Sequence, residues 1–346
     1  MEVETNRDGL ARLTLSVGGE AVLVNGYADV RKIFSDARFS RDLVASGSPR
    51  FWSNEVYVHP DMLLNIDGAR HARLRRTLVP VFGPRLLARC RDRLDAVALE
   101  QARRLATLPA PADLVTEYAF PLAARMLCEL TGASEHFDGL LDWMVRTAQA
   151  PRDRDEEKVF VDACAVHAGQ LLQVRPAVPP LDTLVALHDT DHALSDGELA
   201  RIVTSLIVGH RTLARLLGAG LPVLLRNPDQ YSAIAGEPGR LPAAVEEILR
   251  LGSRGGARPR VACADVELRA GTIRAGELVF PGVRFANRDP LVFERPDKLD
   301  VLRDRNPHLS LGHSTHHCLA AHLVRHELRA ALTAFVQVFP RAELQN

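Results

Sequence analysis

Residues 308–328 read HLSLGHSTHHCLAAHLVRHEL, and this stretch decides how the rest of the chain is interpreted. A loop of Gly, Ser, Thr and His leads to Cys318, and a helical pattern begins directly after it. A cysteine at the start of a helix feels the positive end of the helix dipole and free backbone N–H groups, which favour the thiolate. Thiolate sulfur is a good ligand for soft metals and for haem iron. Cys318 is therefore a candidate iron ligand, and a buried structural thiol is the alternative.

The same stretch is rich in histidine, which leaves zinc as a competing metal. Cys318, His322 and His326 are spaced four residues apart and would share one face of a helix. Further histidines lie at His313, His316 and His317. The alternative for His322 and His326 is a solvated helix face. These residues alone therefore leave both zinc and haem iron as candidate metals.

Outward from this loop the chain is mainly helical with a minor β region. Helical periodicity covers most of residues 69–226, 240–251 and 319–337, whereas residues 12–24 and 257–285 have strand patterns. Gly18-Gly19 predicts a hairpin turn inside the first strand region. The chain shows no internal repeat and no low-complexity linker, so we predict a single domain over residues 1–346.

One long helix is predicted from Ser195 to Arg226. Ser195 and Glu198 form a capping box at its start, and Asn227-Pro228 stops it.

Composition excludes several classes of protein. Forty-three basic residues balance 43 acidic residues, which gives no reason to expect nucleic acid or an anionic membrane as partner. The five cysteines are scattered without a CxxC, which argues against a disulfide framework. The polar N-terminus and the lack of an 18-residue apolar run predict a cytoplasmic protein with no membrane span.

An ordered series of short motifs surrounds the loop. Glu247 and Arg250 form an ExxR on one helix face, which alone is a common surface pair. The motifs that follow it are residues 260–267, 286–290, 296–303 and 308–318. This series resembles the C-terminal half of the cytochrome P-450 (haem-thiolate) family. Residues 34–40, 67–76 and 207–212 resemble the family's segment before the first pocket loop, its HxxxR helix and its long oxygen-binding helix. The resemblance covers roughly residues 12–340 in the correct order.

The resemblance implies a P-450-like fold, haem b as cofactor and a role for each matched residue. Cys318 would be the axial iron ligand, whose electron donation favours O–O cleavage. Glu247, Arg250 and Arg303 would form a buried ion-pair triad behind the haem, which is costly to break. The haem propionates would be held by charge-assisted bonds from His71, Arg75, Arg260 and His316.

The resemblance also implies an oxidoreductase. We expect a monooxygenase that hydroxylates or oxidatively couples a small secondary-metabolite-type molecule, with electrons from a ferredoxin-type partner. Candidate pocket residues are Phe51, Trp52, Val208 and Ala257, beside Arg211 and Thr212 of the long helix. Core packing is the alternative for Phe51 and Trp52.

The long helix departs from the family pattern. The family has an acid followed by threonine there, and the pair relays protons to bound oxygen. Here Arg211 replaces the acid while Thr212 remains, and an arginine stays protonated. Three readings are open: Arg211 clamps a substrate carboxylate, as in the family's fatty-acid peroxygenases; water and Thr212 carry a slower relay; or oxygen chemistry has been lost. An ion pair directed away from the pocket is the alternative for Arg211.

The haem loop departs as well. Leu311 stands for the family's Phe, and Ser314 and Ala320 replace two glycines. Glycine at such positions permits positive φ and a close approach to the porphyrin. We therefore expect Ser314 to strain the turn and to lower the affinity for haem.

Relative to the family, we expect the N-terminal helix and the C-terminal β hairpin to be absent or minimal. This predicts an open pocket that suits a bulky or carrier-bound substrate. Some family members have lost haem and activate glycosyltransferases, and the short chain and altered motifs fit that alternative. The joint presence of Cys318 and the four propionate residues favours the haem enzyme.

Overall fold

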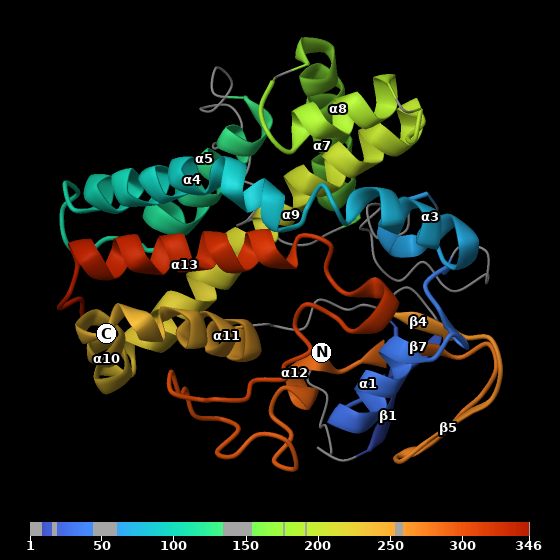
Figure 1. Ribbon diagram of the computed structural model, residues 1–346. Coiled ribbons are helices and arrows are strands. Elements are labelled where there is room, and N and C mark those ends of the chain that lie inside the picture. Colours follow the sequence, from blue (N-terminus) through green and yellow to red (C-terminus); the bar gives the residue numbers. More distant parts are fainter. Residues whose placement is uncertain are drawn as a thin grey trace.

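A computed structural model describes residues 9–15, 19–43, 61–133, 154–175, 177–190, 192–252 and 259–345, with the backbone alone for residues 154–161 (Figure 1). Phe51, Trp52 and Ala257 lie outside the described residues. Helices fill the upper and left parts of the view, and a small sheet with α1 lies at the lower right. The prediction of a mainly helical fold with a minor β region is confirmed.

A five-stranded mixed sheet joins the two ends of the chain. Its order is β1-β2-β7-β4-β3. The strands are β1 Leu10–Thr14, β2 Glu20–Val24, β3 Phe39–Ser40, β4 Arg260–Ala262 and β7 Leu278–Pro281. The predicted hairpin is confirmed, since β1 and β2 pair antiparallel with Leu10 opposite Val24. Strand β2 then pairs in parallel with β7, so the N-terminal hairpin is tied to a strand more than 250 residues later.

A second, two-stranded sheet pairs β5 Val266–Leu268 with β6 Gly271–Ile273. The turn between them uses Gly271 at φ 138°, a conformation that favours glycine. Buried Asp29 of α1 (Tyr27–Ser35) accepts hydrogen bonds from the backbone N–H groups of Arg269 and Ala270 in this turn. The helix and the small sheet are thereby fixed to each other.

The other helices follow in chain order, and short turns separate several of them. The α-helices are α3 Gly68–Leu78, α4 Pro84–Leu105, α5 Phe120–Thr131, α7 Arg154–Val174, α8 Leu181–Asp189, α9 Asp196–Leu225, α10 Pro228–Gly236, α11 Leu241–Gly252, α12 Val283–Ala286 and α13 Ala321–Val338. The single turns are η1 Leu63–Asn65, η2 Val115–Ala119, η4 Pro238–Arg240 and η5 Ser314–His316.

Helix α9 runs diagonally through the middle of the molecule (Figure 1). Its predicted capping box is present: the Ser195 hydroxyl accepts from the Glu198 N–H, and the Glu198 carboxylate accepts from the Ser195 N–H. This cap satisfies backbone donors that the first helical turn leaves without partners. Most of the helix is buried, as expected for an element with apolar residues around most of its surface.

The buried apolar side chains form one large and two smaller clusters. The large cluster, here called the helical core, joins α3, α4, α5, α9, α11 and α13. A smaller one, here called the sheet core, joins α1 with the strands. Leu309 belongs to the sheet core, whereas Leu311 belongs to the helical core. The loop before Cys318 therefore connects the two.

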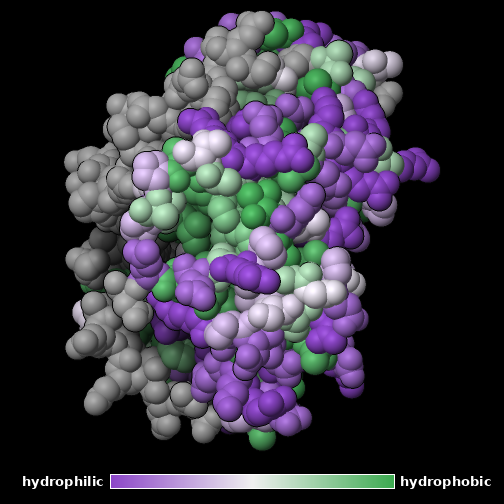
Figure 2. All heavy atoms as spheres, turned by 90° about the vertical axis from the view of Figure 1, so that its left-hand side faces the viewer, coloured by the Kyte–Doolittle hydropathy of each residue, from purple (hydrophilic) through white to green (hydrophobic). Residues whose placement is uncertain are grey.

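The helical core reaches the surface at one side. Figure 2 shows the face at the left of Figure 1, where apolar side chains gather in the centre between hydrophilic rims. The last turns of α4 and α13 point toward this face. Phe339, which follows α13, is one of the partly buried residues that pack against the helical core. Among the helices of the described ranges, none combines the length and apolarity that a membrane span requires.

Candidate functional site

The loop before α13 presents Cys318 in a tight, hydrogen-bonded turn. The Cys318 N–H donates to the Leu311 carbonyl at 2.7 Å, and the His317 N–H donates to the Ser314 carbonyl at 3.0 Å. Gly312 and Ser314 have positive φ values of 77° and 59°. Cys318 is half-buried, forms no disulfide and lies three residues before the first residue of α13. The loop thus presents the sulfur at a position that is open to a ligand.

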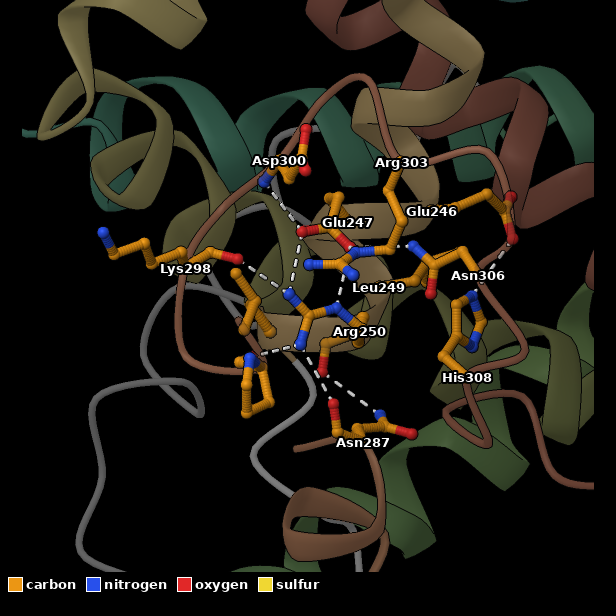
Figure 3. Close-up of polar contacts among 12 residues, drawn as sticks. Glu246, Glu247, Leu249, Arg250, Asn287, Lys298, Asp300, Arg303, Asn306 and His308 are labelled. Carbon is orange, nitrogen blue, oxygen red and sulfur yellow. Dashed lines mark hydrogen bonds and ion pairs between the residues drawn. The ribbon is translucent and has the colours of Figure 1, made fainter. Parts of the chain in front are cut away.

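A buried ion-pair network joins α11 to the segment that precedes this loop (Figure 3). The Arg250 guanidinium donates Nε to Glu247 Oε1 at 2.7 Å and Nη2 to Oε2 at 2.8 Å. Arg303 donates Nε to the same Oε1 at 3.0 Å. Glu247 and Arg250 have no exposed side-chain surface, so the charges are satisfied entirely inside the protein. The structure thus brings the three triad residues into contact.

Arg250 also fixes the chain before the loop. It donates to the carbonyl oxygens of Asn287 at 3.0 Å, Lys298 at 2.9 Å and Pro296. Its guanidinium lies 5.2 Å from the centre of the buried Phe293 ring. One side chain of α11 therefore holds three points of a loop-rich segment that has little regular structure of its own.

Asn287 is a second anchor that the sequence analysis missed. Its fully buried amide donates to the Arg250 carbonyl and the Ser310 hydroxyl, and accepts from the Leu309 N–H at 2.8 Å. Ser310 in turn donates to the Leu249 carbonyl at 2.6 Å. These bonds tie the end of α11 to the entrance of the cysteine loop. The only sequence signal for Asn287 is its place in the motif at residues 286–290.

Glu246, next to the ExxR glutamate, forms a separate network that sequence reasoning also missed. It accepts Nε and Nη2 of Arg325 on α13 at 2.7 and 3.0 Å, and Nε2 of His308 lies 3.1 Å away. Burial acts to raise the pKa of Glu246, but the hydrogen bonds from His308 and Arg325 lower it to about 2. Adjacent glutamates on α11 therefore hold the chain on both sides of Cys318.

A cluster of basic side chains lies beside the thiol. His71 on α3 stacks against His316 of η5 with ring centres 4.3 Å apart. Arg75, one turn after His71, is close enough to Cys318 for the sulfur to affect its pKa, which burial lowers. Buried Arg260 on β4 places its guanidinium 5.5 Å from the Phe34 ring and acts electrostatically on His316. The four residues assigned to propionates therefore meet around one place, although they come from three distant segments.

Asp67 is the acidic member of this cluster. It is the N-cap residue of α3, but its side chain does not cap the helix. Its carboxylate instead accepts from the Ser40 hydroxyl and the Arg41 N–H, and lies 2.8 Å from His316 Nε2. Burial acts to raise the pKa of Asp67, and these hydrogen bonds outweigh burial and lower it. The sequence placed Asp67 at the head of the HxxxR helix without revealing this contact.

The electrostatics of the cluster are positive. Burial, together with His316 and Arg75 and against Asp67, lowers the pKa of His71 to about 4. Burial also lowers the pKa of His316, with Arg260 and Arg41 acting in the same direction against Asp67. An electropositive, partly buried site beside a thiol fits a cofactor that carries carboxylates and a thiolate-binding iron. The residues present therefore fit haem.

Helix α9 contributes a different surface. Solvent reaches Gly209 and Thr212 halfway along a helix that is otherwise mostly buried, and Val208 is half-buried. Arg211 is only 6% exposed. Val208 and Cys318 both pack against the helical core. Thr212 thus lies on the open face of α9, whereas most of the Arg211 surface is covered.

The His210 side chain lies on a buried side of α9 and contacts α13. Its Nε2 lies 3.0 Å from Glu327 Oε1, and its Nδ1 lies 2.8 Å from the Leu206 carbonyl. Both side chains are almost fully buried. No pattern in the sequence links two residues 117 positions apart, so this pair was not predicted.

The zinc alternative finds no support in the described residues, where no three His, Cys, Asp or Glu side chains are grouped as metal ligands. His322 is exposed, whereas His326 is buried and lies 3.2 Å from Asp95. The predicted common helix face does not form because α13 begins only at Ala321.

Comparison with known proteins gives consistent matches. A family model described as cytochrome P-450 matches residues 168–341. Nocardicin C N-oxygenase of Nocardia uniformis subsp. tsuyamanensis is 34% identical over 342 residues, which cover 96% of this chain and 85% of that protein. Mycinamicin IV hydroxylase/epoxidase of Micromonospora griseorubida is 35% identical over 350 residues, which cover 97% of this chain and 86% of that protein.

Solved structures agree with these relatives. The LnmA cytochrome P-450 hydroxylase from the leinamycin pathway of Streptomyces atroolivaceus aligns with a TM-score of 0.85 and 35% identity, over 98% of this chain and 88% of that one. The LnmZ hydroxylase of the same pathway aligns with a TM-score of 0.88 and 30% identity, over 100% of this chain and 97% of that one.

Proposed function

Because the chain belongs to the cytochrome P-450 family and is a monooxygenase with haem b as cofactor, we propose that it oxidises a small organic molecule of secondary metabolism. The reaction is a hydroxylation or an oxidative coupling. Two relatives are named for oxidising nocardicin C and mycinamicin IV, which supports this class of substrate. We further propose that the enzyme acts in the cytoplasm.

The observation that carries this proposal is that Cys318 lies beside a cluster of basic side chains. We propose that the Cys318 sulfur, which the hydrogen-bonded turn presents half-buried, would hold the haem iron. We assign the propionates to His71, Arg75, Arg260 and His316. Charge-assisted bonds of this kind are shorter and stronger than neutral ones, which suits retention of a cofactor. Bound haem supplies the iron centre at which dioxygen is reduced and oxygen is transferred.

The networks behind the loop have a supporting role in this proposal. Glu247 and Arg250 fix the segment before the loop, and Glu246 fixes α13 after it. A sulfur held between two fixed segments keeps its position when the substrate enters. Such rigidity in the surrounding protein is what keeps a metal ligand in productive geometry.

On the open face of α9, we assign proton delivery to Thr212 together with water. The Thr212 side chain is exposed and its hydroxyl can both donate and accept a proton, whereas a guanidinium only donates. Val208 is assigned to the wall of the substrate pocket together with Phe51, Trp52 and Ala257.

A ferredoxin-type protein is the proposed electron donor. The cysteine loop lies next to α1, where Arg31 donates Nε to His313 at 3.2 Å. Arg31 and Arg76 are both exposed and supply positive charge for an acidic partner. Electrostatic steering of this kind weakens with salt. Reduction by ferredoxin is therefore expected to slow as the ionic strength rises.

A reduced CO-difference spectrum tests the haem assignment. Protein expressed with haem precursor is expected to give the red-shifted Soret band of a thiolate complex. Cys318→Ser is expected to lose this band, whereas the exposed control Cys263→Ser keeps it. If the wild-type protein binds no haem under conditions where related proteins load fully, the enzyme assignment fails. Co-purification of a glycosyltransferase would then support the haem-free alternative.

The arginine at position 211 favours hydrogen peroxide as an alternative oxidant. An arginine at the acid position can hold a substrate carboxylate, and hydrogen peroxide would then replace dioxygen and ferredoxin. Arg211→Glu is expected to raise dioxygen-driven turnover by at least about tenfold and to lower peroxide-driven turnover, since a carboxylate relays protons. Arg211→Gln, which has no acid, is the matched control. An unchanged ratio of the two activities in Arg211→Glu would remove Arg211 from the chemistry.

A further inference from the structure

Asp67 is held by residues from two other segments of the chain. Its Oδ2 accepts from the Ser40 hydroxyl at 2.8 Å and from the Arg41 N–H at 2.7 Å, while Oδ1 lies 2.8 Å from His316 Nε2. Ser40 ends β3, Asp67 precedes α3, and His316 belongs to the cysteine loop. One carboxylate therefore connects β3, α3 and the cysteine loop.

Only an ionised carboxylate can make this set of contacts. The Arg41 N–H and the His316 N–H are donors, and Ser40 Oγ already accepts from the Asp42 N–H at 2.9 Å, which leaves its own proton for Asp67. An asparagine oxygen could still accept from Ser40 and Arg41, but its NH₂ group would then face His316 Nε2 and could not accept the proton of that nitrogen. The lowered pKa of Asp67 agrees with an ionised group.

The contact fixes the direction of the His316 ring. Because Asp67 accepts the Nε2 proton, only Nδ1 remains to face another acceptor, and it donates there when the ring is the imidazolium, which carboxylates on both sides stabilise. The His71 ring lies against it at an interplanar angle of 37° with ring centres 4.3 Å apart, and the His316 side chain is only 13% exposed. Arg41 is itself fixed, since its guanidinium donates to the Leu64 and Pro259 carbonyls at 2.8 and 2.7 Å. The backbone segment that bonds Asp67 is thus itself held by a buried arginine.

We propose that Asp67 is a positioning residue for haem retention, which orients His316 so that its Nδ1 faces a haem propionate. This rests on the proposed role of His316. Partners of this kind hold metal-binding histidines in place in other proteins, where their loss costs about 10- to 100-fold in affinity. The same reasoning applies to a histidine that binds a propionate, and it gives Asp67 a function although it does not contact the cofactor.

The rate of haem transfer to excess apomyoglobin tests the proposal. Asp67→Asn and His316→Ala are each expected to release haem about tenfold faster than the wild type. The double variant is expected to release it no faster than His316→Ala, because Asp67 acts through the histidine. The propionate-bending band in resonance Raman spectra should shift equally in both single variants. Asp95→Asn, which removes another Asp–His contact on α4 and α13, is the matched control and should retain haem.

The outcomes distinguish a failure of the positioning role of Asp67 from a failure of the propionate role of His316. If His316→Ala releases haem quickly and Asp67→Asn does not, or if the two effects multiply, the positioning role of Asp67 is overturned. If His316→Ala behaves as the wild type, the propionate assignment falls as well. Should Asp67→Asn fail to fold, Ser40→Ala keeps the carboxylate and the His316 contact. It removes one anchor, and it should accelerate release by a smaller factor than His316→Ala.

Discussion

The two residues that replace glycines near Cys318, Ser314 and Ala320, differ in backbone conformation. Ser314 adopts φ 59°, in the left-handed region that disfavours residues with a Cβ, whereas Ala320 adopts φ −90° and ψ 22°. The expectation that Ser314 is strained thus agrees with its backbone. At Ala320 the backbone does not require glycine. The sequence could name both positions but could not tell them apart, because φ depends on the whole turn.

Ser314→Gly is expected to stabilise the haem-free protein by about 0.5–1 kcal/mol, since glycine removes the left-handed penalty and loses part of the gain as chain entropy. Ala320→Gly is the matched control. It relieves no strain and should destabilise by a similar amount. Urea unfolding of both variants measures the difference. Equal effects of the same sign would contradict the assignment of strain to Ser314.

At the scale of elements, Glu246 connects α11, α13 and the segment that precedes the loop. Its pKa of about 2 lies below the ordinary value of 4.5, so its contribution to stability is present above pH 4.5 and is lost as the pH falls toward 2. Glu246→Gln is expected to destabilise the haem-free protein at pH 7 by roughly 2–3 kcal/mol. Urea unfolding at pH 7 and pH 3 should show this difference shrinking in acid.

The exposed pair of Glu237 with Arg240 provides the control. Glu237→Gln should change the free energy of unfolding by less than about 1 kcal/mol, because exposed ion pairs contribute little. A destabilisation by Glu246→Gln that is the same at both pH values would show that packing, rather than charge, explains the loss.

The networks also show what could be predicted from sequence. Glu247 and Arg250 are three residues apart on one helix, so the helical period alone places them together. Glu247 has further partners 53 to 59 residues away, which are the Asp300 N–H, Arg303 and the Asn306 amide, and resemblance to a family named only Arg303. Glu246, Asn287 and Asp67 were missed because contacts between distant segments leave no periodic signal. The capping box of α9 was predicted fully because it is local.

His210 and Glu327 connect α9 to α13 in the same long-range way. The Leu206 carbonyl can only accept, so Nδ1 carries a proton and a single proton lies between Nε2 and Oε1. Glu327 and the Leu206 carbonyl raise the pKa of His210 although burial acts to lower it. The pair therefore orients two helices on which proposed functional residues depend.

A double-mutant cycle measures this pair. His210→Leu and Glu327→Leu are each expected to cost roughly 3–5 kcal/mol, because each leaves a buried polar group without its partner. The double variant should be less destabilised than either single one, since two apolar groups replace both members. Chemical unfolding of the haem-free proteins gives the four free energies. Simple additivity would mean that the two side chains do not depend on each other.

At the scale of the whole molecule, the proposed haem ligands come from both sides of the fold. Cys318 packs against the helical core, and His71 lies on α3, which contributes to the same core. Arg260 lies on β4, and Ala262 of the same strand belongs to the sheet core. The loop from Leu309 to Leu311 passes between the two. Haem bound as proposed would therefore link the cores as well as carry out chemistry.

Amide hydrogen exchange with and without haem tests this link. A ligand that binds only the native state protects the segments whose opening would release it. Haem is therefore expected to slow exchange about 10- to 100-fold in α3, β4 and residues 308–318 together, while α8, which carries none of the assigned residues, remains unchanged. Cys318→Ser should weaken the protection on both sides at once, because the loss of one contact releases the whole ligand. Protection that appears in α3 and the loop but not in β4 would show that Arg260 does not hold the cofactor, and that the sheet is joined to the helices by the protein alone.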